Sequence, residues 1–214
     1  MFENYFKIAW RNLRKSKGYS FINIAGLATG MAVSLLIGLW IWDEVSFDNH
    51  FKNKPRLAQV MVTQSFKDQW YTGESVGIPV AEAIRSNYSD DIEKVALVSY
   101  RNNWVIGAGE KKLSASGIWA QPDFPDMFTL QMVQGNRAVL KDPSAILISQ
   151  SLAKALFGDA NPLNALVKLA NKMDMKVGGV YEDFPFNTSF YETKIILPWN
   201  NNENWMKNLK EWDN

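Results

Sequence analysis

The 214-residue sequence contains no cysteine and a single histidine, His50. Without cysteine the chain has no disulfide framework, no thiolate chemistry and no lipoprotein anchor. One histidine excludes a multi-histidine metal site, and the calcium-loop pattern D-x-[DN]-x-[DN]-G is missing. The phosphate-binding pattern G-x-x-x-x-G-K-[ST] is missing too, because residues 107–112 (GAGEKK) lack its spacing and its hydroxyl. We therefore expect no metal, no cofactor and no enzymatic activity in this chain.

Catalytic carboxylates and nucleic-acid binding are also poorly supported by the sequence. The adjacent acidic pairs Asp90–Asp91 and Glu182–Asp183 are better explained by turn solvation and capping than by general acid–base chemistry. The residues after position 20 contain 18 Lys and Arg against 21 Asp and Glu, so they are mildly acidic. No basic patch indicates a nucleic-acid partner.

Residues 21–42 form the most informative segment, because they read FINIAGLATGMAVSLLIGLWIW without one charged side chain. About 20 apolar residues in a helix span the hydrocarbon core of a bilayer, which is about 30 Å thick. A cleaved signal peptide has a shorter apolar region of about 7–15 residues and a small-residue cleavage site. The run ends instead in LWIW, which favours an uncleaved transmembrane helix.

The residues beside this run predict its orientation and its contacts with the interface. Residues 1–20 carry five basic residues and one acidic residue, whereas Asp43 and Glu44 directly follow the run. Basic loops stay on the cytoplasmic side, so the N-terminus should be inside and residues 43–214 outside. Apolar residues at helical spacing in 2–14 predict an amphipathic helix on the inner membrane surface, within residues 1–20; a soluble helix packed on a partner is the alternative. The residues expected at the two membrane interfaces are Trp10, Arg11, Arg14, Lys15, Lys17, Trp40 and Trp42.

Small residues recur every four positions inside the run: Gly26, Gly30, Ser34 and Gly38. Such a stripe lets two helix backbones approach closely in a bilayer. We expect it to be a helix-packing face, which a solitary membrane anchor does not need.

The remaining 172 residues are enough for one domain with a hydrophobic core. Their pattern predicts an α+β domain, with helices at 79–88 and at 150–157, the latter capped by Ser149 and ended by Gly158. The expected strands are 57–66, 95–100, 104–106, 113–120, 145–148, 166–169 and 175–181. A helix-like pattern also appears at 205–212.

Five segments, in order along the chain, carry a family resemblance. They are FKIAWRNLRKSKGYSFINIAGLATGMA at 6–32, EVSFD at 44–48, DFPDMFTL at 123–130, ISQSLAKALFG at 148–158 followed by Asn161–Leu163, and VGGVYEDFPFNTSF at 177–190. This sequence resembles MacB/FtsX-type ABC transporter permeases. The family usually has glycine at the position of Asn164, and Phe-His where this chain has His50-Phe51.

The resemblance implies the N-terminal piece of a permease in a bacterial inner membrane: a transmembrane helix, then a MacB-like periplasmic core domain that is incomplete at the C-terminus. It implies an ABC-type ATPase subunit and a permease dimer partner, the lipid membrane, and an extracytoplasmic adaptor or lipoprotein. ATP hydrolysis on the separate subunit would then drive export or other work outside the membrane. The alternative is a single-span anchored extracytoplasmic binding or sensor module.

Overall fold

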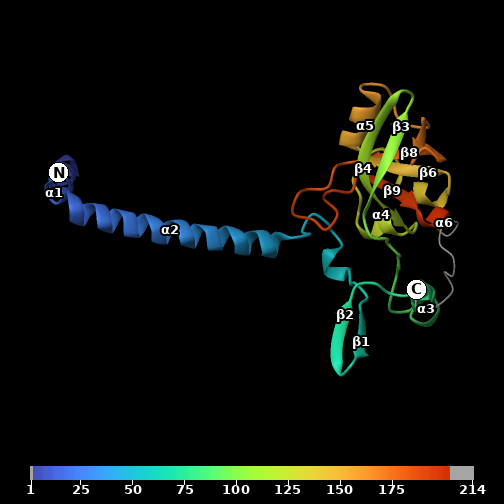
Figure 1. Cartoon of the computed structure of the whole chain (residues 1–214), viewed down its shortest axis with the longest axis horizontal. Helices are drawn as coiled ribbons and strands as arrows, with labels where there is room; N and C mark the ends of the chain where they lie inside the picture. The colour runs from blue at the N-terminus through green and yellow to red at the C-terminus, as the bar shows by residue number, and fades with distance from the viewer. Residues whose placement is uncertain (1, 203–214) are drawn as a thin grey trace. The chain divides into compact units, whose positions relative to one another are not determined.

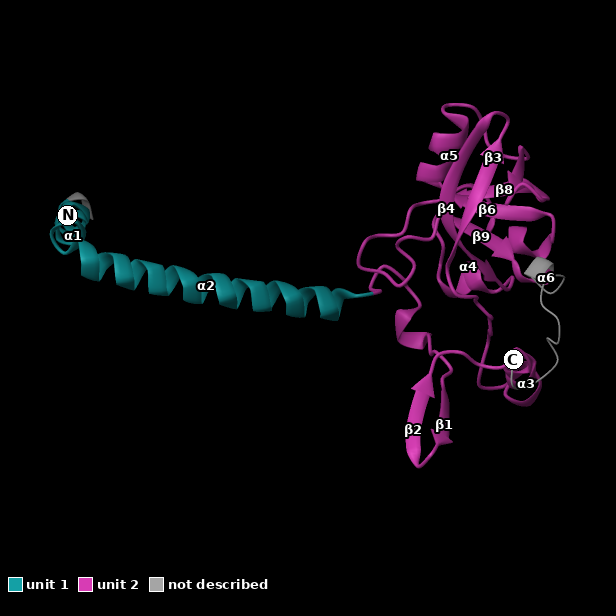
Figure 2. Ribbon diagram, in the orientation of Figure 1, with its two compact units in different colours: residues 1–47 teal, residues 48–214 magenta. Residues whose placement is uncertain are grey.

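The computed structural model describes the backbone of residues 2–202 and the side chains of residues 4–200 (Figure 1). The helix-like pattern at 205–212 lies outside the described residues. The chain divides into two compact units, residues 1–47 and 48–214 (Figure 2).

The first unit contains two helices, α1 (Phe2–Lys15) and α2 (Lys17–Ser46). Ser16 separates them because its φ of −112° and ψ of 57° are not helical. α2 has 30 residues, none of them buried, and at 1.5 Å per residue it is about 45 Å long. It therefore extends the apolar run 21–42 by four residues at each end.

The second unit is built on a seven-stranded sheet in the order β5-β8-β6-β9-β4-β3-β7, in which β7 also pairs with β8. The extra pairing closes six strands into a ring, because β8 pairs with both β6 and β7. Closing the ring removes the open edges of these six strands, and β5 is an additional strand paired with β8. The strands are β3 (Asn102–Ala108), β4 (Lys111–Ala120), β5 (Met132–Gly135), β6 (Ala145–Ser149), β7 (Leu166–Leu169), β8 (Met173–Tyr181) and β9 (Ile195–Pro198).

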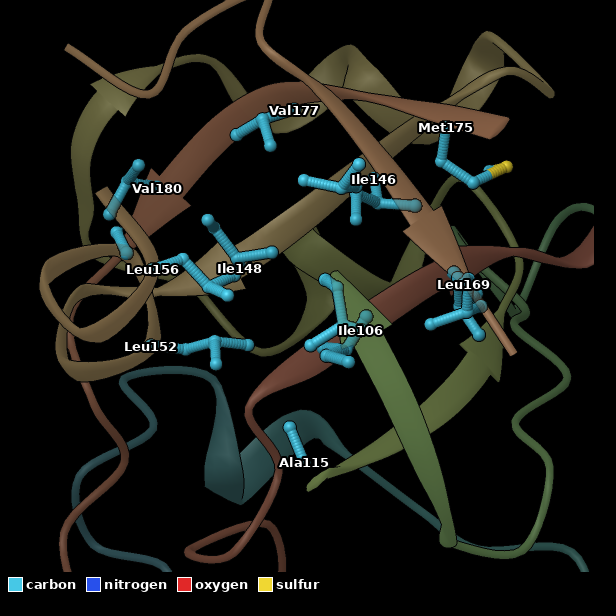
Figure 3. Packing of buried hydrophobic residues seen from close by; sticks show 14 of the residues in the cluster. Ile106, Ala115, Ile146, Ile148, Leu152, Leu156, Leu169, Met175, Val177 and Val180 are labelled. Atoms are coloured by element: carbon cyan, nitrogen blue, oxygen red, sulfur yellow. The ribbon is translucent and has the colours of Figure 1, made fainter. Parts of the chain in front are cut away.

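The core lies inside this sheet and beneath α5 (Gln150–Phe157). Every residue of β6 is buried, as expected of a strand covered on both faces. Figure 3 shows Ile106, Ile146 and Ile148 pointing toward one another, with Leu152 of α5 beside them. A second cluster is rich in aromatic rings and includes Phe124 of α4 (Phe124–Met127).

Turn residues confirm several local predictions. The Ser149 hydroxyl accepts a hydrogen bond from the Leu152 N–H and caps α5, and Gly158 ends the helix with φ +64°. Asn164 also has φ +64°. Asparagine tolerates this left-handed conformation better than most residues with a Cβ, so Asn164 suits the positive φ of its turn.

Other predictions are corrected by the structure. The predicted strand 57–66 forms only from Val62, as β1 (Val62–Phe66), which pairs with β2 (Gln69–Gly73) in a separate two-stranded sheet. The predicted strand 95–100 makes only an isolated bridge from Val98 to Ala120, because only two backbone hydrogen bonds join it to residues 119–121. β2, β5 and β9 were not predicted.

The remaining elements are α3 (Pro79–Asn87), α6 (Trp199–Asn202) and the 3-10 helices η1 (Lys54–Arg56) and η2 (Arg137–Lys141).

Candidate functional site

α2 is the helix in the described part of the chain that is long and apolar enough to cross a membrane, by length and composition. Its large apolar side chains, including Trp40 and Trp42, are exposed in the structure. In water this surface would be strongly unfavourable, because exposed apolar area costs about 25 cal/mol per Å². A lipid or protein environment removes that cost.

The predicted packing stripe lies along one face of α2. Gly26, Gly30 and Ser34 line a shallow groove together with Ile22, Leu27 and Met31. A Cβ added at Gly26, Gly30 or Gly38 would meet nothing within 4 Å. The groove is therefore open, and a second helix backbone could approach along it.

The predicted membrane-interface residues fall on both helices. Trp10, Arg11 and Arg14 lie on α1, and Arg14 sits over the Trp10 ring at 5.4 Å from its centroid. Lys15 ends α1 and Lys17 begins α2, so both basic side chains flank the break at Ser16. Trp40 and Trp42 lie near the other end of α2.

Asp48 lies two positions after the end of α2. Three hydrogen bonds join it to residues 187 and 189 of the domain. Its carboxylate accepts one from the Ser189 N–H at 2.8 Å and one from the Ser189 hydroxyl at 2.6 Å. Its own N–H donates to the Asn187 carbonyl at 2.9 Å. Asp48 adopts φ +59°, a conformation that aspartate tolerates better than most residues. We call residues 48–53 the junction segment.

The side chain of Phe51 packs the junction segment into the aromatic cluster. Its ring is 2% exposed and makes edge contacts with Phe128 at 5.1 Å, Phe184 at 5.8 Å and Phe190 at 6.2 Å. Edge-to-face pairs of this kind stabilise a core beyond simple burial. The ring therefore fixes the start of the domain against two distant parts of the chain.

Polar contacts hold the other end of the junction segment. The Asn53 side chain donates to the Met127 carbonyl at 3.1 Å, and the Lys52 N–H donates to the Thr129 hydroxyl at 3.3 Å. Residues 48–53, which begin with the last residue of the resemblance segment 44–48, thus contact two other segments that carry the family resemblance, 123–130 and 177–190.

Asp183 forms a second connection inside the domain. It accepts hydrogen bonds from the Ser151 N–H at 2.8 Å and the Ser151 hydroxyl at 2.5 Å, and it pairs with Lys194. Partial burial raises the pKa of Asp183, but hydrogen bonds from Lys194 and Ser151 outweigh it, so the pKa is below its ordinary value. The carboxylate joins the start of α5 to the residue before β9, as a structural cap.

Sequence reasoning recognised these segments but not the residues that meet in them. Asp48, Phe51 and Ser189 lie up to 141 positions apart, and no periodicity within one segment indicates such contacts. Among the described residues, no group of three or more His, Asp or Glu side chains could hold a metal ion.

Comparisons with known proteins assign the chain to a family. A family model of the MacB-like periplasmic core domain matches residues 20–212. The match therefore begins one residue before the apolar run 21–42 and includes it. The chain belongs to the MacB-like periplasmic core domain family. The resemblance drawn from the five segments and the α+β fold class are both confirmed. A search of curated proteins gives no match.

Solved structures show a similar fold. A domain of a Porphyromonas gingivalis protein assigned as a permease is 27% identical, with a TM-score of 0.54, over 71% of this chain and 65% of that chain. The periplasmic region of MacB from Actinobacillus actinomycetemcomitans is 21% identical, with a TM-score of 0.50, over 61% and 58%. The extracellular domain of the noncanonic ABC-type transporter YknZ from Gram-positive bacteria is 20% identical, with a TM-score of 0.44, over 56% and 62%. The chain covers less than two thirds of each.

Proposed function

We propose that this chain is the N-terminal part of a permease subunit of a MacB/FtsX-type ABC transporter. A separate ATPase subunit moves the membrane helices, and the domain outside the membrane moves with them to export or act on an extracytoplasmic substrate. The N-terminus and α1 lie on the cytoplasmic side of a bacterial inner membrane. A second permease copy or chain packs on the stripe of α2, and an adaptor or lipoprotein is the partner outside.

The junction carries this proposal. Asp48 and Phe51 lie two and five positions after the end of α2 and are bound to segments more than 70 residues away in the sequence. A flexible tether would serve a plain anchor, because an anchor only has to keep the domain near the membrane. Contacts that hold the first residues of the domain in its own core suit a subunit in which the domain must respond to displacement of the helix before it.

The packing stripe provides the first experiment. In the full-length permease, Gly30→Leu places a large side chain where a helix backbone must approach, so co-purification of the partner ATPase should fall sharply. Ala32→Leu is the matched control, because it adds a side chain of the same size about 200° around the helix. Equal recovery of an ATPase with both variants would show that the stripe is not a packing face. Recovery of no ATPase with the unaltered permease would favour the anchored sensor instead.

The junction provides the second experiment. Asp48→Asn keeps a residue that tolerates φ +59° but replaces a carboxylate oxygen facing Ser189 by an amide donor. Asp142→Asn is the control, because Asp142 accepts the same two kinds of hydrogen bond from Ser144, at 2.9 and 2.6 Å, within one local turn. We expect only Asp48→Asn to alter the rate of ATP hydrolysis of the assembled complex in vesicles. Unchanged hydrolysis in both variants would contradict coupling through the junction.

A further inference from the structure

We propose that the outer edge of β1 pairs with the same strand of a second copy of this chain, so that two β1–β2 hairpins form one four-stranded antiparallel sheet. Gln64 lies on the two-fold axis between the two copies. The inference goes beyond the proposed function, because it needs neither the ATPase nor the packing stripe of α2.

The β1–β2 hairpin is a sheet of its own. Every residue of the two strands except Val62 is exposed, including Phe66, Trp70 and Tyr71. In the part of the chain that the structure describes, no third strand pairs with β1 or β2, and Figure 2 shows the hairpin projecting away from the seven-stranded sheet. A two-stranded hairpin is only marginally stable in water, whereas three or more strands with an apolar face are stable. Additional strands would therefore stabilise this hairpin.

The turn of the hairpin decides which backbone groups are free at its edges. Both turn residues have positive φ, as in a two-residue type I′ turn, so the flanking residues Phe66 and Gln69 form a hydrogen-bonded pair. Hydrogen-bonded and non-hydrogen-bonded pairs alternate along an antiparallel ladder. Thr63 and Ser65 therefore direct their N–H and C=O groups away from β2. A row of such groups is a template for another strand.

The sequence of β1 and of the residues before it lacks the features that block pairing between chains. Residues 57–66 (LAQVMVTQSF) contain no charge, no proline and no glycine. Natural proteins usually protect an exposed edge strand with charges or proline, and uncharged segments of high β-propensity readily pair between chains. The edge of β1 has no such protection.

The side chains of β1 complement one another in an antiparallel register centred on Gln64. Phe66 then lies opposite the partner's Val62, which makes an aromatic–β-branched pair. Thr63 lies opposite the partner's Ser65, which makes a pair of hydroxyl side chains. Both kinds of pair stabilise adjacent strands. Since Thr63 and Ser65 also direct their backbone groups outward, the same register supplies the hydrogen bonds between the copies.

The outer edge of β2 does not suit the same arrangement. A register centred on Tyr71, the middle residue of β2, would place Asp68 opposite the partner's Glu74, and like charges directly opposite each other destabilise a sheet. Gly73 would also lie in the pairing, and glycine has no side chain to pack. The two β1 strands are therefore the inner strands, in the order β2–β1–β1–β2.

Because the chain has no cysteine, a single cysteine reports the pairing directly. In the proposed sheet the two Cα atoms at position 64 are about 4.5 Å apart, which a disulfide can bridge. The two Cα atoms at position 72 are separated by three strand spacings, about 14 Å, which a disulfide cannot bridge. The whole chain with Gln64→Cys or Thr72→Cys is purified in detergent and oxidised with copper phenanthroline. We expect about fivefold more covalent dimer, or a larger excess, from Gln64→Cys.

Proline substitutions test whether strand pairing brings the cysteines together. Ser65→Pro removes an N–H that faces the second copy, whereas Thr72→Pro removes an N–H that faces outward from β2, because Thr72 pairs with Thr63. In the Gln64→Cys chain, Ser65→Pro should lower the yield of dimer about fivefold or more, and Thr72→Pro should change it less than about twofold. The hairpin is a sheet separate from the core, so neither pairing nor these substitutions should shift the melting of the core, which circular dichroism checks.

Each other outcome overturns the inference. Equal yields of dimer at positions 64 and 72 would indicate random collision. No dimer at either position would mean that the edge of β1 does not meet a second copy. Dimer at position 64 that resists Ser65→Pro would exclude strand pairing. The purified chain contains no ATPase, so a specific cross-link together with failed ATPase co-purification would reject only the transporter function.

Discussion

Replacing Phe51 with alanine tests whether the junction segment is part of the folded core. The ring is 2% exposed and contacts three other phenylalanine rings. Removing a buried phenylalanine costs about 3–5 kcal/mol of unfolding free energy, through lost burial and the cavity left behind. For a domain of 150–250 residues, 1 kcal/mol shifts the melting temperature by about 2–4 °C. We therefore expect a decrease of about 6–20 °C.

The assay is thermal unfolding of the whole chain in detergent, followed by circular dichroism. Phe66→Ala is the matched control, because Phe66 is 64% exposed in the β1–β2 hairpin. Exposed substitutions change stability by about 0.5 kcal/mol or less, so the control should melt within about 2 °C of the unaltered chain. Melting of Phe51→Ala at the temperature of the control would refute the packing of the junction segment.

Two further predictions concern backbone strain and pH. A Cβ at Gly135, which has φ +75°, would lie 2.5 Å from the Gly178 carbonyl oxygen, whereas a Cβ at Gly109, which has φ +59°, would meet nothing within 4 Å. Gly135→Ala should therefore lower the free energy of unfolding, measured in urea, by clearly more than the roughly 1 kcal/mol expected for Gly109→Ala. Equal losses in the two variants would contradict the close approach of β5 and β8. Burial raises the pKa of Tyr181 well above its ordinary 10.0, and its hydroxyl donates to the Thr193 carbonyl at 2.9 Å, so the stability that this tyrosine contributes is fully present below pH 10.0 and is lost as pH rises above it. Tyr181→Phe should lose about 1 kcal/mol of unfolding free energy at neutral pH, but its unfolding free energy should fall less steeply above pH 10.0. Parallel pH profiles of the two proteins would contradict this account.

Elements with strong local signals were predictable from the sequence. The buried run in β6 and the cap and stop of α5, Ser149 and Gly158, need no information from elsewhere in the chain. The apolar run of α2 is of the same kind. Hydrophobic burial and backbone conformation decide these elements locally.

The missed elements depend on weak turn signals or on distant partners. The β1–β2 hairpin turns at Lys67 and Asp68, with φ of +49° and +63°, a conformation usually marked by Asn-Gly or Asp-Gly. β9 ends in Pro198, and proline argues against a central strand; it forms because its neighbour β4 pairs with it in parallel. The junction was missed for the same reason, since its contacts join segments that lie far apart in the sequence.

The central claim is that α2 crosses the membrane and places the domain outside. The direct measurement is labelling of single-cysteine chains in intact cells with a maleimide that cannot cross membranes, with cysteine placed at Asn12 in α1 or at Glu110 in the domain. The account predicts that position 110 is labelled in intact cells, whereas position 12 is labelled only after the cells are permeabilised. Labelling of position 12 in intact cells, or protection of position 110 until permeabilisation, would contradict it.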